Sequence, residues 1–316
     1  MTTSGARTGV LVMAHGTPAR IEEVGSFYTE IRRGRPPSDE QLADLERRYR
    51  VIGGTSPLNA ITLSQARGLS RALEQRHPGL FAVRMGTRFA APRIEEAAHA
   101  LIHDDEVDRV VGLVLAPHSS RASVAHYEQR ARAATEGAGN RARPLYMVDH
   151  WYDAPGFDAL VAIRLRSALD DLDDDAGRRV LVVFSAHSVP AALVAAGDTY
   201  AEQVETSARA AAEAAGVERW ALAWQSAGRT DDEWLGPDVR AVIADAPAGG
   251  ATAVVVCPIG FVADHLEVLY DVDVEAMVTA RSAGIAFART ASFNADEDFC
   301  ALLAAVVVAG AGVEAV

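Results

Sequence analysis

Hydrophobic residues gather in short unbroken runs that end at glycine, proline or another small residue. These runs predict buried strands near residues 9–14, 81–86, 110–116 and 144–148, and again near 179–185, 219–225 and 252–257. Longer stretches between them have the spacing of amphipathic helices, at 58–76, 91–103, 121–135, 156–171 and 199–215. Because strands and helices alternate, the pattern predicts an α/β fold built from parallel sheets with helices on both faces.

The chain contains a weak internal repeat. VLVMAHGTP, which ends at Pro18, and LVVFSAHSVP, which ends at Pro190, each join an apolar strand to Ala-His, a small residue and a proline. We therefore predict two Rossmann-like domains related by duplication, at residues 1–172 and 173–316. The acidic segment 171–177 is the expected linker, and the last helix is a candidate to pack back on the first domain.

Composition excludes several classes of function. The chain has 316 residues, 49% hydrophobic, and a net charge of −13, which disfavours nucleic acid as a partner. It contains no lysine, so Schiff-base catalysis and a P-loop are excluded. Two cysteines cannot form a disulfide framework or a four-cysteine cluster. Without a signal-peptide pattern or a long apolar run, we expect a cytoplasmic protein with no stable membrane insertion.

Residues with catalytic potential follow several predicted strands. His15, His118 and His187 each come directly after an apolar run, and in parallel sheets ligands bind beyond these strand ends. A lone histidine at such a position is more often structural. Several imidazoles converging on one edge are expected to form a site.

An acidic segment follows the strand that ends at Cys257. It holds Asp264, His265, Glu267, Asp271 and Glu275, and on a helix the carboxylates at 267, 271 and 275 lie along one side, where they repel one another. A bound cation would offset that repulsion. The alternative is a capping box from Asp264 to Glu267 followed by a solvated face.

Positive charge is concentrated in one segment of this acidic chain. Arginines lie at positions 32, 33, 35, 47, 48 and 50, and guanidinium groups suit a ligand with several carboxylates. The alternative is that Arg47, Arg48 and Arg50 pair with Asp44 and Glu46 on a surface helix. Two tryptophans, at 224 and 234, fit either an aromatic wall beside a cleft or the core.

Six motifs together identify a resemblance. VLVMAHGTP, YTEIRRGRPPS, RYRVIGGTSPL, FSAHSVP, WQSAGRTDDEWLGPDV and GFVADHLEVLYDVDVE occur in the order found in bacterial ferrochelatases, and in particular in the coproporphyrin III ferrochelatases of Gram-positive bacteria. The resemblance covers nearly the whole chain. It implies a two-domain chelatase fold with the porphyrin in the cleft between the halves, and ATP-independent insertion of Fe(II).

The resemblance also implies roles for individual residues. His187 and Glu267 match the pair that binds iron and accepts pyrrole protons. Asp271 and Glu275 match outer carboxylates that bind a hydrated cation, with Mg²⁺ or iron in transit as the alternatives. The porphyrin-contacting positions are matched by His15, Arg32, Arg48, Tyr49, Ser56 and Tyr127. His15 stands where close relatives usually have tyrosine.

The residue types suit this chemistry, since imidazole is a good ligand for Fe(II) and a base near neutral pH, while carboxylates prefer a hydrated ion. We expect Fe(II) as a substrate, no [2Fe–2S] cluster, and a monomer with transient partners of the haem pathway. Four propionates need more cationic partners than two, which favours coproporphyrin III. The alternatives are protoporphyrin IX, a cobalt or nickel sirohydrochlorin-type chelatase, and a non-catalytic haem or metal carrier.

Overall fold

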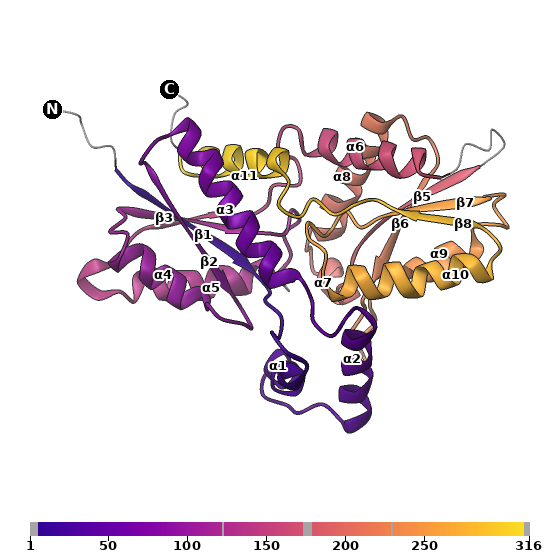
Figure 1. Ribbon diagram of the computed structural model, residues 1–316, viewed down its shortest axis with the longest axis horizontal. Helices are drawn as coiled ribbons and strands as arrows, with labels where there is room; N and C mark the ends of the chain where they lie inside the picture. Colours follow the sequence, from indigo (N-terminus) through magenta and orange to yellow (C-terminus); the bar gives the residue numbers. More distant parts are fainter. Residues whose placement is uncertain (1–5, 122, 173–178, 229, 313–316) are drawn as a thin grey trace. The chain divides into compact units, whose positions relative to one another are not determined.

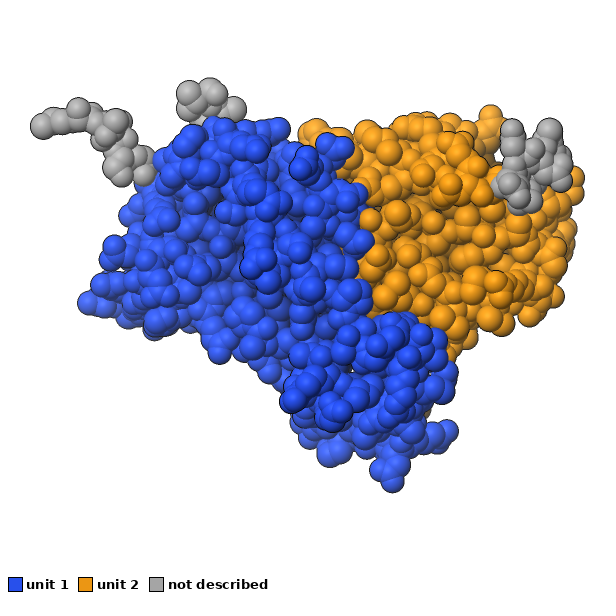
Figure 2. Space-filling model, in the orientation of Figure 1, with its two compact units in different colours: residues 1–116, 123–151, 293–316 blue, residues 117–122, 152–292 orange. Residues whose placement is uncertain are grey.

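The computed structural model describes residues 6–121, 123–172, 179–228 and 230–312 (Figure 1). Contacts divide the chain into two compact units (Figure 2). Unit 1 comprises Met1–Ala116, Ser123–Trp151 and Phe293–Val316, and unit 2 comprises Pro117–Ala122 and Tyr152–Ser292. The predicted boundary after residue 172 differs from this division, and most of the expected linker lies outside the described residues.

Unit 1 contains a parallel four-stranded sheet in the order β2-β1-β3-β4. Its strands are β1 (Thr8–Ala14), β2 (Phe81–Thr87), β3 (Arg109–Val114) and β4 (Leu145–Val148). All seven residues of β1 are buried, since it pairs with β2 on one side and β3 on the other. His15 directly follows β1 and therefore lies at the carboxyl end of an interior strand of the sheet.

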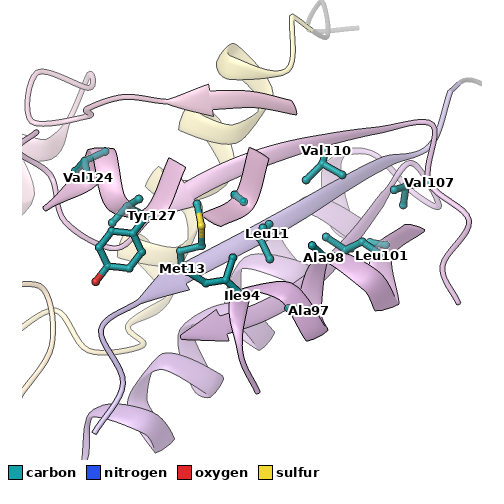
Figure 3. Packing of buried hydrophobic residues seen from close by; sticks show 13 residues of the cluster. Leu11, Met13, Ile94, Ala97, Ala98, Leu101, Val107, Val110, Val124 and Tyr127 are labelled. Carbon is teal, nitrogen blue, oxygen red and sulfur yellow. The ribbon is translucent and has the colours of Figure 1, made fainter. Parts of the chain in front are cut away.

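Helices cover both faces of this sheet (Figure 1). One face carries α4 (Ile94–His103) and α5 (Val124–Glu136), and the other carries α3 (Leu58–Arg76) and α11 (Glu297–Gly310). Leu11 and Met13 of β1 pack against Ile94 and Leu101 of α4 in one hydrophobic cluster (Figure 3). Burial on both faces explains the unbroken apolar run of β1.

A pair of helices extends unit 1 beyond its sheet (Figure 1). It consists of α1 (Val24–Ile31) and α2 (Asp39–Val51), preceded by the 3₁₀ turn η1 (Ile21–Glu23). Ser38 begins α2 with a complete capping box, because its hydroxyl accepts from the Gln41 amide while the Gln41 side chain accepts from the Ser38 amide. The Arg-rich segment of the sequence is therefore largely helical.

Unit 2 repeats the sheet of unit 1. Its strands are β5 (Val180–His187), β6 (Trp220–Gln225), β7 (Ala253–Cys257) and β8 (Ala286–Arg289), all parallel, in the order β6-β5-β7-β8. β1 and β5 occupy the same place in their sheets. This agreement in strand order supports the internal repeat.

Helices again cover both faces of the second sheet. Contacts place α6 (Phe157–Asp170) and α8 (Tyr200–Ala215) on one face, and α9 (Val239–Asp245), the π-helix η3 (Glu267–Ala276) and α10 (Met277–Ser282) on the other. A short α7 (Ala191–Ala195) follows β5, and the 3₁₀ turn η2 (Gly139–Arg141) precedes β4. The fold class predicted from the sequence is confirmed in both units.

Several elements differ from the prediction. The strand β8 and the helices α1, α7, α9 and α10 were not predicted, α2 was expected only as the surface-helix alternative, and the acidic helix after β7 is a π-helix over most of its length. The last helix was expected to pack back on the first domain, and α11 does pack against α3 and β4 of unit 1. Among the described residues, no helix is both long enough and apolar enough to cross a membrane.

Candidate functional site

His187 is the last residue of β5, and its side chain is 39% exposed. Its Nδ1 lies 2.5 Å from the carbonyl oxygen of Ser188, so the Nδ1–H donates to that oxygen. This bond fixes the ring and directs Nε2 toward Glu267, whose Oε1 is 3.6 Å away. The two residues that the sequence paired are therefore neighbours within unit 2.

Glu267 begins the π-helix η3 and lies between two imidazoles. Its second oxygen, Oε2, is 3.6 Å from Nε2 of His265, and Nδ1 of His265 is 2.9 Å from the carbonyl of Ala263. The role of His265 was not predicted from the sequence. Its position two residues before Glu267, in the segment DHLE, is the signal that could have identified it.

The charges of this cluster are coupled. Burial by itself lowers the pKa of His187, but the Glu267 carboxylate outweighs burial and raises that pKa to about 9. Burial by itself raises the pKa of Glu267, but His187 and His265 hold it well below its ordinary value. At neutral pH the ligand-free pair is therefore an imidazolium beside a carboxylate.

Asp271 and Glu275 follow Glu267 along η3. The hydroxyl of Ser226 donates to Oδ2 of Asp271 at 2.5 Å, and Asp271 is only 7% exposed. Oε2 of Glu275 lies 3.5 Å from Nη1 of Arg240. The alternative of a solvated face is therefore wrong for Asp271, which is buried.

The capping-box alternative involves Asp264, whose side chain has partners outside η3. The residue before η3 is Leu266, with no side-chain capping bond. Asp264 instead accepts a hydrogen bond from Ser292 and lies 3.4 Å from Arg289. Because π-helical bonds close at i→i+5, the turn is wider than an α-turn, and residues four apart remain close to one side.

Aromatic residues surround His187. The ring of Trp234 is 6.4 Å from the imidazole, and the hydroxyl of Tyr200 donates to the His187 carbonyl at 3.0 Å. Trp224 is 5% exposed and packs on Tyr200. Of the two tryptophans, Trp234 lies beside the candidate site and Trp224 belongs to the core.

Glycines allow two close approaches near the candidate residues. A Cβ on Gly260 would lie 2.7 Å from the Cβ of Ala186, so glycine lets the loop after β7 pass against β5 next to His187. Gly16, which follows His15, has a φ of +81°, and a Cβ there would lie 2.6 Å from Oγ1 of Thr87. A glycine is therefore required next to each histidine: Gly16 directly after His15, and Gly260 in the loop that packs beside His187.

In unit 1, His15 is enclosed by aromatic rings. Its imidazole centroid is 4.7 Å from that of Phe89 and 6.0 Å from that of Phe27. Nδ1 lies 2.9 Å from the Gly16 carbonyl, which repeats the geometry of His187 and Ser188. The Nδ1–H therefore donates, and Nε2 is the basic nitrogen.

Two further predicted residues lie near His15 in the structure. Tyr127 contacts Arg88, the neighbour of Phe89, and Tyr49 contacts Thr17, two residues after His15. The buried Tyr127 has Arg88 above its ring at 5.1 Å, and burial raises its pKa to about 12. The hydroxyl of Tyr49 lies 2.9 Å from Oγ1 of Thr17, and both are buried. Unit 1 therefore brings His15, Tyr49 and Tyr127 to one end of its sheet.

The remaining predicted residues of unit 1 have local partners. Ser56 accepts a bond from the Leu58 amide at the start of α3. Nε of Arg48 lies 3.1 Å from Asp44, as the surface-helix alternative predicted, and Arg32 lies 5.5 Å from the ring of Tyr28.

His118 does not belong to the candidate site. It is 2% exposed, its Nε2 lies 2.7 Å from the hydroxyl of Ser207, and burial lowers its pKa to about 3. The expectation that all three strand-end histidines converge is wrong for this residue, which has a structural environment.

Residues 6–121, 123–172, 179–228 and 230–312 contain no arrangement of three or more His, Cys, Asp or Glu side chains suited to hold a metal ion. Cys257 and Cys300 are both buried.

Comparisons with known proteins agree with one another. The profile of a family described as Ferrochelatase matches residues 7–311. A protein from Geobacillus kaustophilus named coproporphyrin III ferrochelatase is 41% identical over 302 residues, 95% of each chain. Its Bacillus subtilis namesake is 41% identical over 307 residues, covering 96% of this chain and 98% of the relative.

Solved structures share the fold at low identity. SirB from Bacillus subtilis with Fe³⁺ superimposes with a TM-score of 0.60 at 11% identity, covering 97% of this chain and 98% of that chain. CbiX of denitrifying bacteria gives a TM-score of 0.51 at 15% identity, covering 95% and 98%. This likeness is evidence of fold alone.

Proposed function

Because this chain belongs to the ferrochelatase family of metal chelatases, we propose that it inserts Fe(II) into coproporphyrin III to give Fe-coproporphyrin III in haem biosynthesis. The observation that carries the proposal is the facing pair His187 and Glu267, 3.6 Å apart in unit 2. Fe(II) is a substrate of this reaction.

Insertion exchanges one Fe²⁺ for the two pyrrole protons, so the site must both bind the cation and take up protons. In the ligand-free state His187 already carries a proton that Glu267 stabilises. A dication beside Glu267 opposes that protonation, so binding of Fe²⁺ releases the imidazolium proton and frees Nε2 as a ligand. Glu267 and His187 then accept the pyrrole protons as the iron leaves them.

We assign the outer carboxylates to a hydrated cation. Asp271 and Glu275 follow Glu267 on one helix, and carboxylates suit an ion that keeps its water. The ion is Mg²⁺ or iron in transit. The same two carboxylates can accept protons that Glu267 has taken from the porphyrin, and so carry them away from the reacting atoms.

We assign the predicted residues of unit 1 to the porphyrin. Phe27 and Phe89 hold His15 with Nε2 as its basic nitrogen, which suits an approach to the central metal. Arg32 and Arg48 are assigned to propionates. The other assigned contacts are Tyr49, Ser56 and Tyr127.

Coproporphyrin III is favoured over protoporphyrin IX by charge as well as by the relatives' names. Four propionates need more cationic partners than two, and six arginines lie between positions 32 and 50. A cobalt or nickel sirohydrochlorin-type chelatase and a haem or metal carrier are weaker alternatives, since the sirohydrochlorin chelatases match only in fold. We propose a cytoplasmic monomer with transient haem-pathway partners.

Fe(II) insertion into coproporphyrin III and protoporphyrin IX, measured for the wild-type protein and His187→Ala, tests this proposal. We expect the wild type to prefer coproporphyrin III. Loss of the imidazole removes both ligand and base, so turnover by His187→Ala should fall by about 10²–10⁴-fold, while porphyrin binding, followed by fluorescence quenching, is retained.

His99→Ala is the matched control, because His99 is an exposed histidine on α4 of unit 1. It should turn over like the wild type. Preference for protoporphyrin IX would overturn the substrate assignment, normal turnover by His187→Ala would overturn the residue assignment, and porphyrin binding without turnover by the wild type would favour a carrier.

A further inference from the structure

Gln225 is a buried glutamine whose two side-chain ends bond to different segments of unit 2. It is 1% exposed and ends β6, directly opposite His187 in the register of β5 and β6. Its Oε1 accepts from the hydroxyl of Ser185 at 2.8 Å, and its Nε2 donates to the backbone carbonyl of Glu267 at 3.2 Å. The amide group thus joins β5 to the first residue of η3.

The main chain of Gln225 makes a third connection. Its carbonyl accepts from the amide of Ser188 at 2.8 Å, and the Ser188 carbonyl is the group that fixes Nδ1 of His187. One residue is therefore bonded to the backbone beside His187 and to the backbone of Glu267.

The next residue continues the same pattern. Ser226 has a φ of +58°, a left-handed conformation that is uncommon for serine, and its hydroxyl donates to Asp271 at 2.5 Å. Backbone strain of this kind persists where the surrounding contacts enforce it, and it is concentrated at functional sites. The end of β6 thus contacts η3 at Glu267 and, one turn later, at Asp271.

We propose that Gln225 is a positioning residue for the metal-insertion reaction, holding the backbones that carry His187 and Glu267 at their working separation. This inference rests on the proposed function of that pair. Gln225 does not touch the reacting atoms, and it acts through its hydrogen bonds to the Ser188 amide and to the Glu267 carbonyl.

Energetics distinguish this role from that of an ordinary core residue. A buried amide with both ends bonded stabilises any fold by a similar amount, wherever it lies. A shift of the Glu267 backbone, in contrast, changes the 3.6 Å separation of the catalytic pair, and misplacement by about 1 Å costs up to about 10²-fold in rate. A positioning role therefore predicts a loss of rate larger than the loss of stability explains.

The test compares Gln225→Met with Gln203→Met. Methionine keeps the length of glutamine without its hydrogen bonds, and Gln203 is the matched control because it is also buried in unit 2 with both ends bonded, to Ser119 and Thr199. Thermal midpoint, porphyrin binding by fluorescence quenching, and kcat and KM for Fe(II) insertion are measured for both variants, the wild type and His187→Ala.

We expect similar losses of thermal midpoint in the two variants. Gln225→Met should lower kcat by about 10–100-fold with porphyrin KM changed by less than about threefold, whereas Gln203→Met should keep kcat within about threefold of the wild type. Equal effects of the two substitutions on kcat would overturn the inference. Normal turnover by His187→Ala would instead overturn the assignment of that residue, on which this inference rests, and absence of turnover by the wild type would overturn the proposed function.

A second matched pair covers the case in which Gln225→Met does not fold. Ser185→Ala removes only the hydroxyl that anchors Oε1 of Gln225, and Ser207→Ala removes a buried hydroxyl of unit 2 that contacts His118. Ser185→Ala should lower kcat by about 3–10-fold, and Ser207→Ala should not. Equal kcat values for these two variants would likewise overturn the inference.

Discussion

Imidazole groups in this protein titrate according to what surrounds them. His187, beside a carboxylate, has a pKa raised to about 9, whereas His118, buried against Ser207 and Tyr152, has a pKa lowered to about 3. The first holds a proton at neutral pH and the second does not. Under the proposed function, the first therefore has a proton to exchange for a metal ion.

The pKa of His118 predicts a specific loss of stability in acid. Above pH 6.5 the residue is neutral whether the chain is folded or unfolded, so it contributes no pH dependence. As the pH falls from 6.5 toward 3, only the unfolded chain binds the proton, and the free energy of unfolding should decrease by up to about 1.4 kcal/mol per pH unit. Urea unfolding of unit 2 between pH 4 and 8 measures this slope.

His118→Gln isolates the contribution, because glutamine can still bond Ser207 but does not titrate. Its stability should fall less steeply below pH 6.5 than that of the wild type. Identical slopes for the wild type and His118→Gln would contradict the lowered pKa.

The same three histidines show how far the sequence could predict the site. His15, His118 and His187 share one signal, an apolar strand followed by imidazole. The pairing of His187 with Glu267 was predicted, through the resemblance. The burial of His118 was not, because its partner Ser207 lies on α8 and nothing near His118 in the sequence indicates that contact.

At the scale of elements, α2 carries two of the residues that we assign to the porphyrin, and its stability depends on the hydrogen bonds of its first turn. Arg48 and Tyr49 lie in its last turns, and the helix begins with the capping box of Ser38 and Gln41. Charges at both ends also interact favourably with the helix dipole and stabilise the helix: Asp39 and Glu40 lie in the first turn, and Arg48 and Arg50 in the last. Since α2 buries only Tyr49, the cap contributes a large share of its local stability.

Ser38→Ala should therefore weaken α2 by about 1 kcal/mol. Faster hydrogen exchange in α2 amides, and a porphyrin KM that rises while kcat changes little, are the expected results, because the reacting pair is carried by other elements. Ser64→Ala is the matched control, since Ser64 is an exposed serine inside α3. Unchanged exchange in α2 would contradict the role of the cap.

Elements with a strong pattern were predicted, and those shaped by tertiary contacts were not. The strands that are buried on both faces, such as β1 and β7, have continuous apolar runs that read directly from the sequence. The segment from Glu267 to Ala276 was predicted as a helix, but its π-helical form was not. Its bonds to Gln225 and Ser226 are contacts with a distant strand, and no local pattern records them.

At the scale of the whole molecule, the chain ends in the unit where it begins. Residues 293–316 belong to unit 1, and α11 packs against α3 and β4. Its contacts include Phe299, whose ring is 5.9 Å from that of Trp151. Unit 1 therefore completes its core only after the whole of unit 2 has been synthesised.

Packing of α11 should therefore stabilise the sheet of unit 1, whose first strand begins at Thr8. Substitution of two leucines tests this expectation. Leu303 of α11 is fully buried, so Leu303→Ala should destabilise unit 1 by about 2–5 kcal/mol. Leu63 of α3 is 41% exposed, and Leu63→Ala should cost less than about 1 kcal/mol. Hydrogen exchange of the β1 and β3 amides across a urea titration reports the difference in unit 1. Equal losses would mean that unit 1 folds without its C-terminal helix, since burial of Leu303 would then contribute nothing to the sheet that it covers.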